Sequence, residues 1–273
     1  MSGILYLVGT PIGNLEDLSP RAARILSEVD FIAAEDTRNS MKLLSHLGIR
    51  KEMVSYYEHN KTMRADLLLS RLQNGESCAL ITDAGMPAIS DPGEDIVRLC
   101  HQNGIETVVI PGPCAAVCAL ALSGLPSRRF AFEGFLPVPA GERRKCLSAL
   151  KGETRTLIFY EAPHRLAKTL KDLYAAFGER EIALVKEITK IHETTENIPL
   201  SQAVSRYEKE ENIRGEFVLI VTGASEIKQE MSDEEIVELL REKTAAGMSR
   251  SEAAKAIAAE FEIPKNRVYR LSK

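Results

Sequence analysis

Residues 79–93, ALITDAGMPAISDPG, join a short apolar run to a loop rich in glycine and proline. Residues 79–82 have the length and character of a buried strand. The tripeptide at 90–92, Ser-Asp-Pro, is typical of the cap and first turn of a helix. Loops of this kind lie at the carboxyl ends of parallel strands, where open α/β sheets bind ligands. An ordinary strand-to-helix turn is the alternative interpretation.

Two further stretches favour a ligand site over an ordinary turn. Residues 5–15, LYLVGTPIGNL, and residues 108–116, VVIPGPCAA, also run from an apolar strand into a loop of glycine and proline. Three such loops in one α/β unit converge on one crevice, and convergence makes a ligand pocket. None of them matches the G-x-x-x-x-G-K-[ST] phosphate loop or the G-x-G-x-x-G dinucleotide fingerprint. We therefore expect a ligand that is not held by its phosphates.

Length and composition limit the class of protein. The 273 residues suit one large domain or two of ordinary size. The net charge of −4 does not indicate a nucleic-acid binder, although local patches matter more than the total. Five cysteines, without C-x-x-C spacing, predict reduced thiols in the cytoplasm. No basic leader precedes the first apolar run, and no run reaches the roughly 20 residues of a membrane span, so no membrane partner is expected.

Strands and helices alternate along residues 1–225, which we divide into two α/β domains at 1–123 and 124–225. This alternation predicts mostly parallel sheets covered by helices on both faces. Residues 114–122, CAAVCALAL, carry no polar side chain and predict a helix buried on all sides, against a neighbouring domain or in a dimer interface. Residues 123–129, SGLPSRR, form the predicted linker.

Residues 226–273 differ in kind and form a third predicted domain, which is small and helical. A polar linker at 226–230 precedes a helix with a capping box of Ser232 and Glu235. Gly247 ends that helix, a second helix follows, and Pro264 opens a third short segment. Helix, glycine turn and helix predict a helix-turn-helix. A solvated carboxyl-terminal cap is the alternative.

Eight motifs stand in a fixed order along residues 1–223: LVGTPIGNLEDLSPRA from Leu7, AEDTR at 34–38, TDAGMPAISDPG from Thr82, IPGPCA from Ile110, FEGFLP at 132–137, FYEAPHR at 159–165, KEITK at 186–190 and GEFVL at 215–219. In these motifs the chain resembles the tetrapyrrole methylase superfamily of S-adenosylmethionine-dependent methyltransferases. Within that superfamily it resembles the branch that methylates ribose 2′-hydroxyls of small-subunit ribosomal RNA. An ordered set of eight motifs is far more specific than any one of them.

The resemblance implies a fold, a cofactor and partners. It implies two αβα domains of the tetrapyrrole methylase type, S-adenosylmethionine in the cleft between them, and a homodimer. It also implies a cytidine in the decoding region of 16S ribosomal RNA as substrate, in free RNA or in the small ribosomal subunit. The superfamily often has serine or threonine where this sequence has Cys114, so only a backbone contact is expected there.

Methyl transfer from a sulfonium to a hydroxyl requires the protein to align two reactants and exclude water. Loops rich in backbone amides and carbonyls, with few charged side chains, suit that task. The predicted donor contacts in the first domain are Pro11, Asp83, Ala84, Gly85, Met86, Ile89, Cys114 and Ala115. Those in the second domain are Tyr160, Glu161, Gly215 and Glu216. A role in loop geometry is the alternative for each.

A ribose 2′-hydroxyl is a poor nucleophile and needs a base or a nearby cation. The candidate catalytic residues are Glu161, His164, Lys186 and Glu187, with Arg165 as a further cation. Lys186 and Glu187 end an apolar strand and are predicted to point into the crevice, with a structural ion pair between them as the alternative. His164 follows Pro163, so an exposed cap position is its alternative. No single base is assigned.

No required metal is predicted. Four acids, Glu35, Asp36, Asp83 and Asp91, stand near predicted strand ends. The sequence lacks clustered histidine ligands, and sites with oxygen ligands leave only weak spacing signals.

Clusters of basic residues favour RNA over a small macrocycle as substrate. The predicted RNA-binding residues are Arg143, Arg144, Lys145, Lys265, Arg267 and Arg270. Two other functions stay open, a methylase of a macrocyclic tetrapyrrole and a non-catalytic nucleic-acid-binding module with a vestigial pocket. An intact donor crevice argues against the second.

Overall fold

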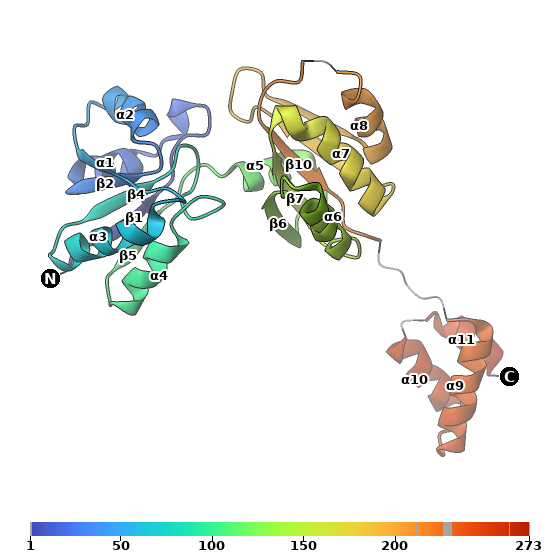
Figure 1. Cartoon of the computed structure of the whole chain (residues 1–273). Coiled ribbons are helices and arrows are strands. Elements are labelled where there is room, and N and C mark those ends of the chain that lie inside the picture. Colours follow the sequence, from blue (N-terminus) through green and yellow to red (C-terminus); the bar gives the residue numbers. More distant parts are fainter. Residues whose placement is uncertain (1, 211, 226–230, 262, 273) are drawn as a thin grey trace. The chain divides into compact units, whose positions relative to one another are not determined.

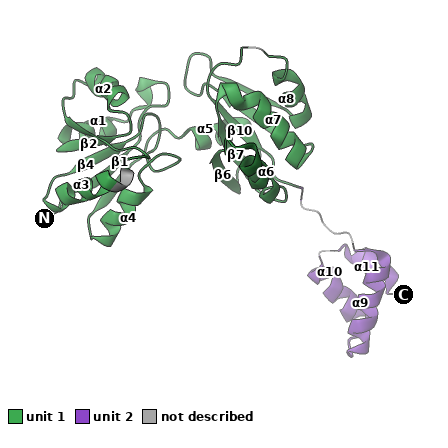
Figure 2. Ribbon diagram, viewed as in Figure 1, with its two compact units in different colours: residues 1–224 green, residues 225–273 purple. Residues whose placement is uncertain are grey.

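The chain divides into two units, Met1–Ala224 and Ser225–Lys273 (Figure 2). The computed structural model describes residues 2–210, 212–225, 231–261 and 263–272, so the linker predicted at 226–230 lies outside the described residues. Two five-stranded sheets belong to the first unit, and three helices belong to the second. The division of the first unit into domains at residue 123 stays a prediction.

The first sheet is parallel, with the strand order β3-β2-β4-β1-β5. Its strands are β1 (Leu5–Val8), β2 (Phe31–Ala34), β3 (Glu52–Ser55), β4 (Cys78–Ile81) and β5 (Thr107–Ile110). The helices α1 (Pro20–Glu28) and α2 (Thr37–His46) cover one face, and α3 (Lys61–Gln73) and α4 (Glu94–Gln102) cover the other (Figure 1). Burial on both faces explains why β2 and β4 are continuously apolar.

The order of the central strands brings the three predicted loops together. β4, β1 and β5 are neighbours in the sheet and run in the same direction, so the loops that follow them leave from one edge. The α/β fold class predicted from the sequence is confirmed for this sheet.

The start of α4 differs from the prediction. The helix begins at Glu94 with Gly93 as its cap, and not at residues 90–92. Asp91 does not cap the helix because its carboxylate accepts a hydrogen bond from the Thr82 hydroxyl. Ala88 and Ser90 have φ values of 66° and 67°, which are incompatible with a helical turn. The loop after β4 is therefore longer than predicted.

The second sheet is mixed, with the order β6-β7-β10-β8-β9. Its strands are β6 (Phe130–Phe135), β7 (Thr156–Glu161), β8 (Glu181–Lys186), β9 (Thr194–Pro199) and β10 (Phe217–Val221). The predicted parallel arrangement holds for β6 and β7, but it is wrong for β10, which runs antiparallel to both β7 and β8. β9 was not predicted because its sequence, TTENIP, is polar and lies at the sheet edge, paired only with β8.

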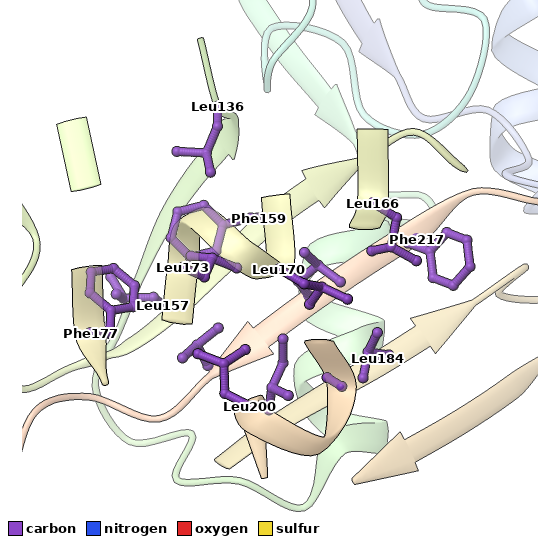
Figure 3. Packing of buried hydrophobic residues seen from close by; sticks show 14 of the residues in the cluster. Leu136, Leu157, Phe159, Leu166, Leu170, Leu173, Phe177, Leu184, Leu200 and Phe217 are labelled. Carbon is purple, nitrogen blue, oxygen red and sulfur yellow. The ribbon is translucent and has the colours of Figure 1, made fainter. Parts of the chain in front are cut away.

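Three helices, α6 (Ala140–Ala149), α7 (Pro163–Phe177) and α8 (Leu200–Tyr207), cover one face of the second sheet. Figure 3 shows leucine and phenylalanine side chains of β7, β10 and α7 meeting in this core. The apolar helix α5 (Ala115–Ser123) packs against the other face, on β7, β8 and β10. Within one chain α5 is not buried on all sides, because Val117, Ala121 and Leu122 form an exposed stripe along it, so its burial in a dimer interface stays a prediction.

The second unit contains α9 (Asp233–Ala245), α10 (Arg250–Glu260) and α11 (Lys265–Leu271). The predicted capping box of Ser232 and Glu235 is present, and Ser249 and Glu252 form a second one at α10. Ile236, Ile257 and Val268, one from each helix, are fully buried in a core of this unit's own. None of the helices in the described part of the chain is long and apolar enough to cross a membrane.

Candidate functional site

A cavity of about 510 Å³ in the first unit is lined by residues that follow or end strands of both sheets. Of the predicted site residues, those in the lining are Asp83, Ala84, Gly85, Met86, Ile89, Cys114, Ala115, Tyr160, Glu161, His164 and Glu216. Five residues predicted to contact the donor or to take part in catalysis are absent from this lining: Pro11, Arg165, Lys186, Glu187 and Gly215. The lining therefore combines most of the predicted donor contacts with one candidate base, His164, and with Glu161, which belongs to both predicted groups.

Backbone contacts hold the three loops of the first sheet together. Thr10 and Gly85 exchange two hydrogen bonds, with N to O distances of 2.9 and 3.1 Å. A Cβ on Gly9 would lie 2.7 Å from the Cα of Gly112, so both positions require glycine. The backbones of the loops after β1, β4 and β5 thus approach one another closely, as the glycine and proline content of these loops predicts.

Tyr160 joins β7 to the first turn of α5 at the cavity wall. Its hydroxyl oxygen accepts a hydrogen bond of 3.1 Å from the backbone N–H of Ala116, in the first turn of α5. Burial raises the pKa of Tyr160 to about 12, so the phenol keeps its proton at neutral pH. The phenol accepts the hydrogen bond from Ala116, so its own O–H group is still able to donate a hydrogen bond to another group.

Two acidic residues that were not among the predicted donor contacts, Glu35 and Asp91, line the same cavity. The Thr82 hydroxyl lies 2.6 Å from Glu35 Oε2 and 2.8 Å from Asp91 Oδ2. A hydroxyl has one proton and donates to only one carboxylate at a time. Burial raises the pKa of Asp91 to about 6, and the charges of Glu35 and Asp83 add to this effect. No group of three or more potential ligands among the described residues is arranged to hold a metal ion.

We expect Asp91 to make stability depend on pH. Its pKa is raised in the folded state from the ordinary value of 3.8, so ionisation costs folding free energy as pH rises from about 4 to about 6. An Asp91→Asn variant does not ionise there. The difference in melting temperature, variant minus wild type, should therefore increase between about pH 4 and pH 7. A difference that stays constant over this range would contradict the raised pKa.

The carboxylate of Glu161 is buried and already engaged by donors. Its side chain accepts hydrogen bonds from the Ala162 N–H and the Thr169 hydroxyl, and Arg165 Nε lies 3.3 Å from it. These contacts leave Glu161 poorly placed to take a proton from a substrate. His164 stands at the start of α7, is exposed, and lines the cavity.

Lys186 and Glu187 do not line the cavity, so their predicted orientation was wrong. Glu187 has a φ of 52°, which turns its carboxylate towards Lys190 Nζ, 2.9 Å away, and towards the N–H of Glu216. An ion pair therefore forms, but its cation is Lys190 rather than Lys186. Gly215 leaves space for it, because a Cβ there would lie 2.7 Å from Glu187 Cγ.

The basic residues fall into two groups. Arg143 is only 3% exposed, and its guanidinium donates to Asp172 at 2.6 Å and to the carbonyls of Pro137 and Val138. Its assignment to an RNA-binding patch was therefore wrong. Arg267 is half-buried and ion-paired with Asp233 at 2.8 Å. The exposed members of the predicted set are Arg144, Lys145, Lys265 and Arg270.

We expect Arg143→Ala to destabilise the first unit by about 3 kcal/mol, because it leaves Asp172 and two carbonyls without their donor. Urea unfolding measures the change. Arg144→Ala is the matched control, since the neighbouring side chain is exposed on the same helix, and it should change stability by less than about 0.5 kcal/mol. Equal free energies of unfolding for the two variants would show that the Arg143–Asp172 pair does not contribute to stability.

Comparisons with known proteins agree with this architecture. The family model of tetrapyrrole (corrin/porphyrin) methylases matches residues 4–204. Ribosomal RNA small subunit methyltransferase I of Synechocystis sp. is 46% identical over 99% of this chain and 97% of that protein. The protein of the same name from Halalkalibacterium halodurans is 45% identical over 98% of this chain and 94% of that protein.

Two solved structures resemble the first unit. Cobalt precorrin-4 methyltransferase has a TM-score of 0.58 at 16% identity, over 80% of this chain and 94% of that one. Uroporphyrin-III C-methyltransferase from Thermus thermophilus, complexed with S-adenyl homocysteine, has a TM-score of 0.56 at 18% identity, over 80% and 96%. These likenesses show the fold. With the matched family model and the close relatives, they establish that the chain belongs to the tetrapyrrole methylase family and, within it, to the ribosomal RNA small subunit methyltransferase I family.

Proposed function

We propose that the protein transfers a methyl group from S-adenosylmethionine to a ribose 2′-hydroxyl of 16S ribosomal RNA, at cytidine 1402 in the usual numbering. The substrate is the RNA itself or the small ribosomal subunit in the cytoplasm. The observation that carries the proposal is an acidic, loop-lined cavity in a chain 46% identical, almost end to end, to a ribosomal RNA small subunit methyltransferase I.

The chemistry of the cavity fits the methyl donor. The described residues that line it include no lysine or arginine, whereas Glu35, Asp83, Asp91, Glu161 and Glu216 contribute five carboxyl groups. Two of these groups have a cation outside the lining, since Glu161 contacts Arg165 and Glu216 contacts Lys190. Acidic surroundings attract the sulfonium cation of S-adenosylmethionine. Apolar side chains of the same lining suit an adenosyl group, and the volume lies within the range of ordinary ligand sites. When bound, the donor supplies both the methyl group and its leaving group.

The remaining task of the protein is to position the ribose and accept its proton. His164 is the candidate base that is both exposed and part of the cavity lining, and we assign proton acceptance to it. A His164→Gln variant should lower kcat and leave donor affinity unchanged. An unchanged kcat would show that His164 does not accept the proton.

The Tyr160 phenol, which is held by its hydrogen bond to α5, would orient S-adenosylmethionine across the cavity.

Mapping of 2′-O-methylated riboses in 16S ribosomal RNA tests the function. Cells that lack the protein should lose one methylated cytidine, and purified protein with S-adenosylmethionine should restore it. Two rival functions predict other results. A tetrapyrrole methylase would leave the RNA map unchanged and methylate a macrocycle, whereas a non-catalytic binder would bind the RNA without methyl transfer.

We propose that the protein is a homodimer, with α5 in the interface. Val117, Ala121 and Leu122 give this helix an exposed apolar stripe, and a second copy is the most frequent partner of such a surface. Sedimentation at micromolar concentration should give the dimer mass, and Val117→Asp should shift it to the monomer. A monomer mass for the wild type would overturn the proposal.

A further inference from the structure

A bulge in β6 decides which way Phe135 faces. Phe132 pairs with Ile158 of β7 and Phe135 pairs with Tyr160, so three steps along β6 match two steps along β7. In a regular strand, residues three apart face opposite sides of the sheet. The extra residue in β6 returns Phe135 to the face that carries Phe132.

The aromatic contacts agree with this register. The rings of Phe132 and Phe135 both pack edge-on against Tyr160, with centroid distances of 5.0 and 5.5 Å. The backbone change occurs at Gly134, where φ is 61°, a value that glycine tolerates best. The bulge therefore brings the Phe135 ring to the wall of the cavity, beside Tyr160.

Phe135 is more exposed than Tyr160 and Phe217, the other phenyl and phenol rings of the lining. It lines the cavity and is nevertheless 56% exposed, so it lies at the mouth. Ile89, which follows β4 and was predicted as a donor contact, also lines the cavity, but its side chain is 48% exposed and so lies at the mouth as well. The two segments approach closely, since a Cβ on Gly134 would lie 3.1 Å from Ser90 Oγ.

The loop around Ile89 is held in a costly conformation. Ala88 and Ser90, on either side of it, both adopt the left-handed region with φ values of 66° and 67°. Non-glycine residues persist in that region where the surroundings enforce it, and ligand clamps are one such place. Two exposed apolar side chains, each set by an unusual backbone feature, thus stand at the mouth of one cavity.

We propose that Phe135 and Ile89 form a clamp for the base of the target nucleotide. This inference rests on the proposed function, in which a ribose must reach a methyl group enclosed in the cavity. An RNA ribose can enter only if its nucleotide leaves the stack, and proteins hold such unstacked bases against aromatic side chains. A pyrimidine ring seated on Phe135 would direct its own ribose inwards.

The adenine of the donor is the competing occupant of this position. Val185, Ile188 and Val218 also line the cavity and are buried, so an apolar surface away from solvent is present for the adenosyl group. A polynucleotide approaches from outside and meets the exposed ring first. The position at the mouth therefore favours the RNA base.

Methylation kinetics with Phe135→Ala test the clamp, with small-subunit ribosomal RNA as the varied substrate. We expect KM for RNA to rise about 10- to 100-fold, as is typical for loss of one stacking contact. Donor affinity, measured by calorimetry, should not change. Phe135→Trp should keep the wild-type KM, and Ile89→Ala should raise KM by a smaller factor.

Val138→Ala provides a matched control. Val138 is 70% exposed, lies three residues beyond Phe135 and is not part of the cavity lining, so its loss should leave both constants unchanged. An unchanged KM for RNA in Phe135→Ala would overturn the clamp. So would a loss of donor affinity with KM for RNA unchanged, because the ring would then serve the adenine. A wild-type protein that transfers no methyl group to RNA would instead disprove the proposed function, and the clamp with it.

Discussion

The Gly85→Arg variant should lose at least about a hundredfold in affinity for S-adenosylmethionine, equivalent to ~2.7 kcal/mol. Gly85 lines the cavity, and its backbone is fixed by two hydrogen bonds to Thr10. An added Cβ would contact Ile12 at 3.4 Å and the Pro113 carbonyl at 3.5 Å, so the loop tolerates the atom itself. The rest of the arginine would occupy the cavity and place a cation beside the sulfonium. Calorimetry measures the loss.

Gly104→Arg is the matched control for this variant. Both glycines have positive φ, 93° at Gly85 and 67° at Gly104, so both substitutions carry a backbone cost of about 1–2 kcal/mol. No atom lies within 4 Å of a Cβ on Gly104, and this residue is not in the cavity lining. Gly104→Arg should therefore have a lower melting temperature than the wild type but the same affinity for S-adenosylmethionine. If Gly85→Arg bound S-adenosylmethionine with wild-type affinity, the loop after β4 would not be part of the donor site.

The first sheet was predictable because four of its strands, β1, β2, β4 and β5, are short, mainly apolar runs, whereas β3, with the sequence EMVS, carries a weaker signal. Burial on both faces gives β2 and β4 a simple sequence signal. β9 has no such signal, since an edge strand with polar side chains gains its stability from pairing with β8. The sequence pattern did not indicate the direction of β10 either. Alternation along the chain does not determine whether a strand inserts antiparallel between two others.

That the loops after β4 and β5 line one cavity was also predictable, because glycine and proline between strands mark loops whose backbone is accessible. Glu35 and Asp91 were considered only as metal ligands, and their place together in the cavity was not predicted, for a physical reason. Their meeting at Thr82 depends on left-handed backbone at Ala88 and Ser90, which neither residue type favours. A sequence pattern contains no indication of such a conformation.

Arg143 was misassigned although a signal was available. Arg143 and Leu147 are four residues apart, so they share one face of α6, and the structure buries both. Arg144 and Lys145 occupy the opposite, exposed face. Helical periodicity therefore places one of the three consecutive basic residues in the core and the other two on the surface, a distinction that local charge alone does not make.

Removal of the second unit, by ending the chain after Ser225, should weaken RNA binding and leave donor binding intact. Each unit has a hydrophobic core of its own, and no residue of the donor cavity lies beyond Val218. Lys265 and Arg270 are exposed in the second unit and suit phosphate contacts. At about 0.15 M salt we expect KM for RNA to rise roughly tenfold or more.

Salt dependence identifies the contacts that are lost. Each phosphate contact contributes about one to the slope of log affinity against log salt, so the truncated protein should have a slope smaller by about two. Lys265→Ser with Arg270→Ser in the full chain should reproduce that change. Arg267 is left intact in this test, because its ion pair with Asp233 makes its loss a change in stability as well.

The same experiment separates the three functions when incorporation of a tritiated methyl group into small-subunit RNA is measured across the salt series. A ribose methyltransferase that holds RNA with its second unit loses activity on truncation, by the largest factor at low salt, where the lost phosphate contacts contribute most. A macrocycle methylase has no use for that unit and keeps its activity on its own substrate. A pure binder transfers no methyl group before or after the cut. Equal activity and equal salt dependence of the two proteins would show that α9, α10 and α11 do not contact RNA.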